Sequence, residues 1–153
     1  MQQHEHAQTG DMSLRQHWMA VLARTGEQLD EHAELLQAQP YERLRPAQVG
    51  MVMVRARAGG DGQAFNLGEM TVTRCVVKLA QGTLGYSYVA GRQLRRAELA
   101  ALADAHLQGP EHETWMQRLV RPMAKAQRRE RAEKAERSAQ TRVRFSTLVR
   151  GED

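Results

Sequence analysis

Arginine is the residue type in this chain with the clearest capacity for specific chemistry, because seven arginines lie on or beside stretches that alternate like β-strands. They are Arg55, Arg57, Arg74, Arg92, Arg142, Arg144 and Arg150. A planar guanidinium group can pair with a carboxylate or a phosphate through two parallel hydrogen bonds. The alternative is a solvated face whose ion pairs contribute little. For Arg142 and Arg144 the sequence does not choose between pairing at an interface and a solvated face. For the helical Arg128, Arg129 and Arg131 it favours the solvated face.

A helical stretch near the N-terminus adds two further candidates for contact with a partner. His17 falls beside Trp18 on an amphipathic pattern, where it could face another molecule. The complete set of partner-binding candidates is His17, Trp18, Arg92, Arg142, Arg144 and Arg150.

No catalytic pattern accompanies these residues. A P-loop requires GxxxxGK[ST], and neither glycine cluster, 59–62 or 82–91, supplies the lysine and the hydroxyl, so we interpret these glycines as turns. The sequence also lacks GxGxxG, HExxH, a cysteine–histidine zinc spacing and the GxSxG nucleophile elbow. Cys75 has no activating neighbour in sequence and is best interpreted as a small buried residue. We therefore expect no catalytic residue, cofactor site or metal site in this chain.

The six histidines favour structural roles over ligand roles. They are His4, His6, His17, His32, His106 and His112. The first two fall in the leader, and the last two flank a loop, where we expect them at the surface.

Basic charge is confined to one segment, which raises RNA binding as an alternative function. Residues 121–150 hold 10 Lys/Arg against 3 Asp/Glu, whereas residues 1–120 hold 12 against 13. Such a segment can meet phosphate, nucleic acid or an acidic protein surface. RNA-binding modules usually add aromatic residues for base stacking, yet only Phe145 lies in the segment. Tyr86 and Tyr88 alternate on one strand face and fit either a small stacking platform or core packing.

Composition is that of a soluble globular domain. The chain has 153 residues, 41% of them apolar and 26% charged, and a single cysteine, which suits a reducing cytoplasm. No apolar run is long enough for a membrane span, and no secretory signal is visible. We expect a disordered leader over residues 1–12 and one α+β domain over residues 13–153, with an extended basic segment at 121–150.

Periodicity predicts helices at the N-terminal end and strands in the middle. Ser13 with Gln16, and Thr25 with Gln28, fit capping boxes that would start two helices, the second stopped by Pro40. Strands are predicted over 49–57, 70–79 and 83–89, with turns at glycines 59–62 and at Gly82. Short connections between successive strands favour an antiparallel sheet.

Helices return after the sheet. A helix is predicted from Leu94 to about Leu107, and a second stripe follows Trp115, with a break or kink at Pro122. Residues 122–139 form a thinly apolar helix supported by the pairs Glu130–Lys134 and Glu133–Arg137. Residues 141–150 alternate like a terminal strand. The predicted fold class is α+β, an antiparallel sheet with an N-terminal helical hairpin and C-terminal helices.

Several phrases in fixed order carry a resemblance to a known family. The chain contains Arg15-Gln16-His17-Trp18-Met19, then Arg57-Ala58-Gly59-Gly60 and Thr71-Val72-Thr73-Arg74. Gly82-Thr83-Leu84-Gly85-Tyr86-Ser87-Tyr88-Val89-Ala90-Gly91-Arg92 follows, and Arg142-Val143-Arg144-Phe145 stands near the end. Over residues 13–152 this resembles the PhnG family, the G subunit of the phosphonate carbon–phosphorus lyase system.

The resemblance implies a non-catalytic subunit of a cytoplasmic complex. In that family the G subunit joins the H, I and J subunits in a hetero-oligomer, without a membrane and without nucleic acid. Together with partner subunits it supports formation of α-D-ribose 1-methylphosphonate 5-triphosphate from ATP and methylphosphonate. The later cleavage uses an iron–sulfur cluster and S-adenosylmethionine in the J subunit. The resemblance therefore implies that ATP and these cofactors belong to partner subunits and that this chain carries none of its own.

Overall fold

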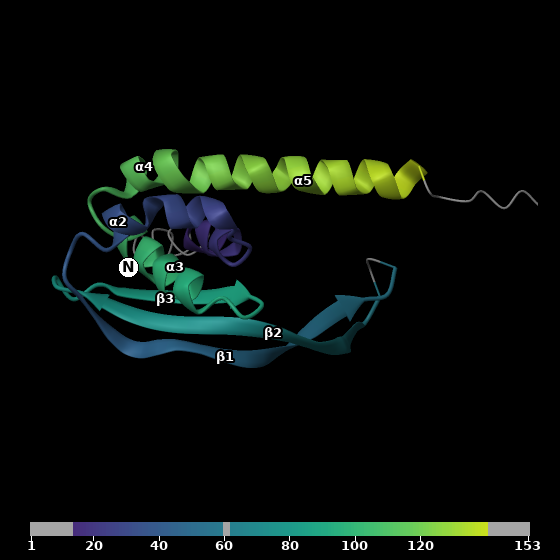
Figure 1. The fold of residues 1–153 in the computed structure, drawn as a ribbon. Helices are drawn as coiled ribbons and strands as arrows, with labels where there is room; N and C mark the ends of the chain where they lie inside the picture. The colour runs from purple at the N-terminus through teal and green to yellow at the C-terminus, as the bar shows by residue number, and fades with distance from the viewer. Residues whose placement is uncertain (1–13, 60–61, 141–153) are drawn as a thin grey trace, which may run out of the picture.

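The α+β fold class is confirmed by a computed structural model of the chain, which describes residues 14–59 and 62–140. Helical residues 14–22 precede the 3₁₀ helix η1 (Glu27–His32) and the short helix α2 (Ala33–Leu36). The strands β1 (Tyr41–Arg57), β2 (Ala64–Leu79) and β3 (Leu84–Ala90) follow. Helices α3 (Leu94–Leu107), α4 (His112–Trp115) and α5 (Arg121–Gln140) complete the described chain. In Figure 1 the sheet is the lower layer, α3 lies on it, and α5 runs above.

The sheet is antiparallel in the order β1-β2-β3, as predicted. Its β2–β3 hairpin turns at Gly82, whose φ of 96° is a conformation that glycine adopts without steric cost. β1 and β2 begin earlier than the predicted starts at residues 49 and 70. The added segments contain Pro46, Asn66 and Gly68, which have low strand propensity, so pairing between the two strands extended them against local preference.

The core lies between the sheet and the helices above it. Every residue of α3 from Leu99 to Leu107 is buried, because the sheet covers one side of the helix and the N-terminal and C-terminal helices cover the other. Small side chains let α3 approach β3 closely. A Cβ atom added at Gly85 would stand 1.9 Å from the carbonyl oxygen of Ala101, so glycine is required at this contact.

The N-terminal helices bury Trp18, Leu22, Leu29 and Leu36 in the same core. The capping box predicted at Thr25 is wrong, since its hydroxyl donates to the carbonyl of Gly26 and no side chain caps η1. Extended backbone at Gly26 separates the two helical segments, which explains why the chain did not form an ordinary capped α-helix there. The cap predicted at Ser13 lies outside the described residues, as does the leader.

The irregularity predicted at Pro122 is a π-helical segment, Met116–Val120, that joins α4 to α5. Proline has no N–H to donate, and its ring would clash with the carbonyl four residues earlier, which here lies in the π-helical segment. The helical path therefore continues from His112 to Gln140 with one change of hydrogen-bonding pattern. Met123 is the one buried residue of α5, Ala124 packs partly against the core, and residues 128–140 are exposed.

Candidate partner-binding surface

Part of the β1–β2 hairpin extends beyond the body of the molecule. β3 pairs with β2 only over Val72–Lys78. Residues 50–57 of β1 and 64–71 of β2 therefore form a two-stranded ribbon, here called the hairpin arm, which leaves the body in Figure 1 on the same side as α5. A two-stranded hairpin is only marginally stable in water by itself.

The hairpin arm exposes large apolar side chains. Met51 is 62% exposed, Met53 51% and Leu67 66%, and Phe65 and Met70 are also exposed. Single exposed apolar residues are ordinary, but a group on one short ribbon marks an interaction surface. Methionine suits such a surface because its unbranched, polarizable side chain adapts to different partners.

Strand register assigns a face to these side chains. Met51 pairs with Thr71 and Met53 with Glu69, and alternation along β2 places Thr71 and Glu69 on the same face as the buried Thr73. Arg55 and Arg57 continue this face along β1 toward the tip. The core-facing side of the sheet thus runs on into an uncovered strip of methionine followed by arginine.

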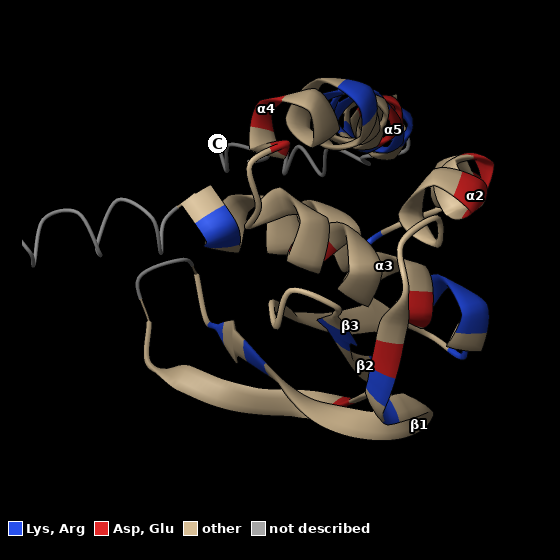
Figure 2. Cartoon of the chain, turned by 90° about the vertical axis from the view of Figure 1, so that its left-hand side faces the viewer, with Lys and Arg blue, Asp and Glu red and all other residues tan. Residues whose placement is uncertain are grey.

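A second element, the outer part of α5, also leaves the body. Gln127 of α5 donates to the carbonyls of Val21 and Arg24 and so ties the helix to the body. Residues 128–140 are all exposed. The predicted ion pair Glu130–Lys134 is present at 3.2 Å. In place of the predicted pair Glu133–Arg137, Arg137 donates to the backbone carbonyl of Glu133, and the Glu133 carboxylate pairs with Arg129 at 3.0 Å. Figure 2 shows Lys, Arg, Asp and Glu close together on α5, as expected for a solvated helix.

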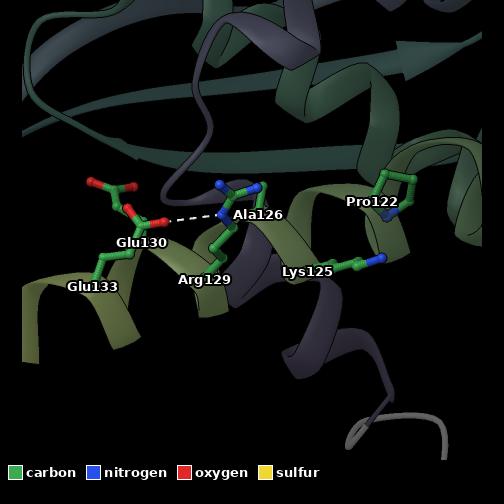
Figure 3. A pocket seen from close by; sticks show the side chains of 6 residues that line it. All are labelled: Pro122, Lys125, Ala126, Arg129, Glu130 and Glu133. Carbon is green, nitrogen blue, oxygen red and sulfur yellow. Dashed lines mark hydrogen bonds and ion pairs between the residues drawn. The ribbon is translucent and has the colours of Figure 1, made fainter. Parts of the chain in front are cut away.

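A hollow follows one side of α5 but lacks the character of a small-molecule site. Its lining residues, drawn in Figure 3, are Pro122, Lys125, Ala126, Arg129, Glu130 and Glu133. All six belong to one helix, so the hollow is an open helix surface without convergent polar groups from other elements.

A buried carboxylate ties the body together. Asp104 of α3 is fully buried and accepts hydrogen bonds from Arg15 at 2.8 and 3.2 Å and from the Trp18 indole at 2.9 Å. The backbone N–H of Tyr86 donates to the same carboxylate at 2.9 Å, and Gln108 donates at 3.3 Å. A buried charge is tolerated only when paired and hydrogen-bonded, and Asp104 meets this condition with donors from the N-terminal helix, from β3 and from the turn after α3.

A second ionic cluster joins β1 to α3 nearer the surface. Arg43 donates to both carboxylate oxygens of Glu98, at 2.7 and 2.9 Å, and Tyr41 donates to Glu98 as well. The guanidinium group lowers the pKa of Glu98, while burial and then the Glu98 carboxylate raise the pKa of Tyr41. Burial raises the pKa of the nearby Cys75 thiol to about 11, which keeps it protonated and unreactive at neutral pH.

Comparison with known proteins assigns the chain to a family. The family described as phosphonate metabolism protein PhnG matches residues 13–151. The chain belongs to the PhnG family. A curated relative from Rhizobium meliloti (strain 1021) is 44% identical over 110 residues, which cover 72% of this chain and 70% of the relative. That relative is named alpha-D-ribose 1-methylphosphonate 5-triphosphate synthase subunit PhnG.

Two of the phrases that carry the PhnG resemblance meet in space. Arg15 and Trp18 come from the first phrase and Tyr86 from the glycine-rich one, and they converge on Asp104. Sequence analysis missed Asp104, although one signal was available. It is the single acidic residue within the apolar helix stretch 99–107, where an unpaired charge would be costly.

The partner-binding candidates of this PhnG chain are placed differently by the structure. His17 and Arg92 are exposed, as a contact residue must be. Trp18 is 3% exposed and holds Asp104, so its assignment to an exposed partner surface is corrected: the apolar stripe of its helix faces the core. Arg142, Arg144 and Arg150 lie outside the described residues.

Three further expectations are resolved by burial. The surface position expected for His106 is wrong, because it is buried, stacks on Trp115 and contacts the Leu36 carbonyl at 3.1 Å. The core-packing interpretation of Tyr86 and Tyr88 is also wrong, because both are exposed, with Tyr88 paired across the sheet with exposed Arg74. The burial predicted for Cys75 is confirmed.

The described residues contain neither a candidate metal site nor a candidate membrane span. No group of three or more His, Cys, Asp or Glu residues within it is arranged to hold a metal ion. None of its helices combines the length and the apolar character needed to cross a bilayer.

Proposed function

We propose that this chain is a non-catalytic structural subunit of the bacterial carbon–phosphorus lyase core complex. In this role it assembles with the H, I and J subunits in the cytoplasm. The assembled subunits form α-D-ribose 1-methylphosphonate 5-triphosphate from ATP and methylphosphonate. Membership of the PhnG family and the similarity to the Rhizobium synthase subunit support this proposal.

The observation that carries a structural role is the uncovered hairpin arm. Met51, Met53 and Leu67 are each more than half exposed on a ribbon that no other element of the described chain covers. Burying one such side chain contributes roughly 1.5–3 kcal/mol, a gain that a partner surface would supply. The exposed outer part of α5 offers a second, charged contact.

The proposal assigns ATP, the iron–sulfur cluster and S-adenosylmethionine to partner subunits. The ionisable groups gathered in the described chain support this assignment, since they hold one another. Asp104 is fully engaged by Arg15 and Trp18, and Glu98 by Arg43 and Tyr41. None of these carboxylates is placed to act on a substrate.

Co-expression with the H, I and J subunits tests the proposal. The tagged chain is purified, and the retained subunits are sized and quantified beside an isolated chain whose folding circular dichroism establishes. A stoichiometric complex that makes the triphosphate product, with no turnover by the isolated chain, is the expected result. Failure of a folded chain to retain any of the three subunits would overturn the proposal.

A basic RNA-binding module is the second candidate. The exposed pair Tyr86 and Tyr88, with Arg74 beside Tyr88 on the open side of the sheet, is the observation that favours it. Aromatic side chains with arginine can stack bases and hold phosphates. RNA binding by the isolated chain that weakens steeply with salt would favour this function over the first. That binding should be lost in Tyr86→Ala/Tyr88→Ala.

A further inference from the structure

β1 is an edge strand along its whole length, and its first part is protected against pairing with other strands. Pro46 removes one backbone donor, and Arg43 and Arg45 place charge on the edge. The register shifts between Arg43 and Arg45 and between Arg45 and Gln48 each add one residue on β1, so the edge itself is bulged. These features are the usual means by which proteins prevent edge-to-edge association.

Within the hairpin arm, residues 50–54 of β1 have none of this protection. Pairing with β2 is regular from Gln48 to Val54, without proline or charge. The one further shift, between Val54 and Arg55, adds its extra residue, Leu67, on β2 and leaves the β1 edge unbulged. Residues 50–54 therefore present a regular, apolar row of backbone donors and acceptors at a free edge.

We propose that the free edge of β1 over residues 50–57 accepts an extended strand from a partner subunit, which continues the sheet by β-augmentation. The incoming strand carries apolar side chains beside Met51 and Met53 and carboxylates beside Arg55 and Arg57. This inference rests on the proposed function and specifies how the subunit is held. In such recognition the main chain contributes affinity, and alternate side chains contribute specificity.

The positive charge of the hairpin arm favours an acidic strand as the partner of the β1 edge. Arg55 makes no hydrogen bond or ion pair within the described chain, and Arg57 contacts only the Gly62 carbonyl at 3.4 Å. Carboxylates of a partner would satisfy both guanidinium groups. The chain's own predicted strand at 141–150 carries Arg142, Arg144 and Arg150 and would add like charge instead.

A second copy of the chain is also disfavoured as occupant. Within residues 50–57, 64–71 and 121–140 there are nine Lys/Arg and four Asp/Glu, an excess of five positive charges. Edge pairing between two copies would bring two such excesses together, whereas an acidic partner strand neutralises one.

Amide hydrogen exchange in the purified complex and in the isolated full-length chain tests the inference directly. Alternate amides of residues 50–57, whose N–H groups point away from β2, are expected to exchange at least tenfold more slowly in the complex. Met53→Lys, which places a lysine on the edge strand, is expected to weaken partner binding at least tenfold. Leu94→Lys is the matched control, since Leu94 is 53% exposed at the start of α3 and lies off the arm.

The outcomes separate this inference from the proposed function. A complex that forms with unchanged exchange at residues 50–57 overturns β-augmentation and leaves the subunit role intact. Concentration-dependent protection in the isolated chain identifies self-pairing and also overturns it. Failure of the folded chain to bind the H, I and J subunits removes the proposed function, and the inference with it. Circular dichroism of Met53→Lys establishes that the variant is folded.

Discussion

β2 passes through two environments that differ in almost every physical respect. From Val72 to Leu79 it lies between two strands and under α3, with Thr73, Cys75, Val77 and Leu79 buried. From Ala64 to Met70 it has one neighbour, no covering helix and only exposed residues. The first part is stabilised by the chain's own core. The second part is paired with β1 but has no core packing from the described residues.

This difference places the stabilising core and the proposed partner-binding surface in separate parts of the chain. Core packing tolerates little change because interiors are close-packed, and the body is held together at Gly85 and Asp104. The hairpin arm and the outer α5 contribute little to folding and are free to be shaped by a partner. Substitutions in the body should therefore lower folding stability, whereas substitutions in the hairpin arm or the outer α5 should weaken partner binding.

The largest expected effect is at the contact between β3 and α3. Gly85→Ala is expected to cost about 3 kcal/mol or more, because the new methyl group would collide with the backbone of Ala101, which cannot move aside as a side chain could. Gly50→Ala in the arm, where an added Cβ meets nothing within 4 Å, should change stability by less than about 1 kcal/mol. Urea unfolding of both variants measures the difference. Equal losses would show that the arm and the body fold as one cooperative unit.

The next effect concerns the buried carboxylate. Asp104→Asn is expected to cost about 2–3 kcal/mol, since it removes the charge that Arg15 and the Trp18 indole engage and leaves buried donors poorly satisfied. Glu113→Gln, which breaks the exposed pair with Arg121, should change stability far less. Thermal unfolding followed by the near-ultraviolet signal of the tryptophans compares them. A neutral Asp104→Asn would contradict the role assigned to this network.

Sequence reasoning predicted the elements whose residues agree with their local surroundings. α3 runs from Leu94 to Leu107 as predicted, because helix propensity and burial favour the same state there. The early parts of β1 and β2 were missed because Pro46 and Gly68 oppose strand formation, and only the pairing of two distant segments overrides them. The strand predicted over 49–57 includes Met51 and Met53, but the sequence did not show that β3 pairs with β2 only as far as Val72.

The candidate site was less predictable than the fold. Trp18 and His106 have side chains that suit both cores and interfaces, and the choice depends on which elements pack above them. Asp104 acquires its role only when the fold brings Arg15, Trp18 and Tyr86 to it. Arg15 and Trp18 are each more than 80 residues away from Asp104 in sequence. Local patterns carry no information on such contacts.

A smaller effect is expected from the charge of the outer α5. Arg128→Gln/Arg129→Gln/Arg131→Gln should lower the association rate with the partner subunits about tenfold at low salt while leaving stability unchanged. The matched control is Arg24→Gln/Arg95→Gln/Arg118→Gln, which removes three exposed arginines from the body. Stopped-flow association at several salt concentrations measures both. The same rate for the two triple variants would assign steering to net charge and not to α5.

The smallest expected effect concerns pH and the cluster that joins β1 to α3. Arg43 lowers the pKa of Glu98 in the folded chain, so the folded state binds a proton at Glu98 less readily than the unfolded chain does. The stabilisation is therefore fully present above the ordinary pKa of 4.5 and is lost as pH falls from there through the lowered value. Because Arg43 is 53% exposed, solvent screening keeps this contribution small. Glu98→Gln should flatten this part of the stability–pH curve without altering exchange at residues 50–57, since the cluster anchors the body end of β1. A change at the arm would instead show that the two parts of the strand are coupled.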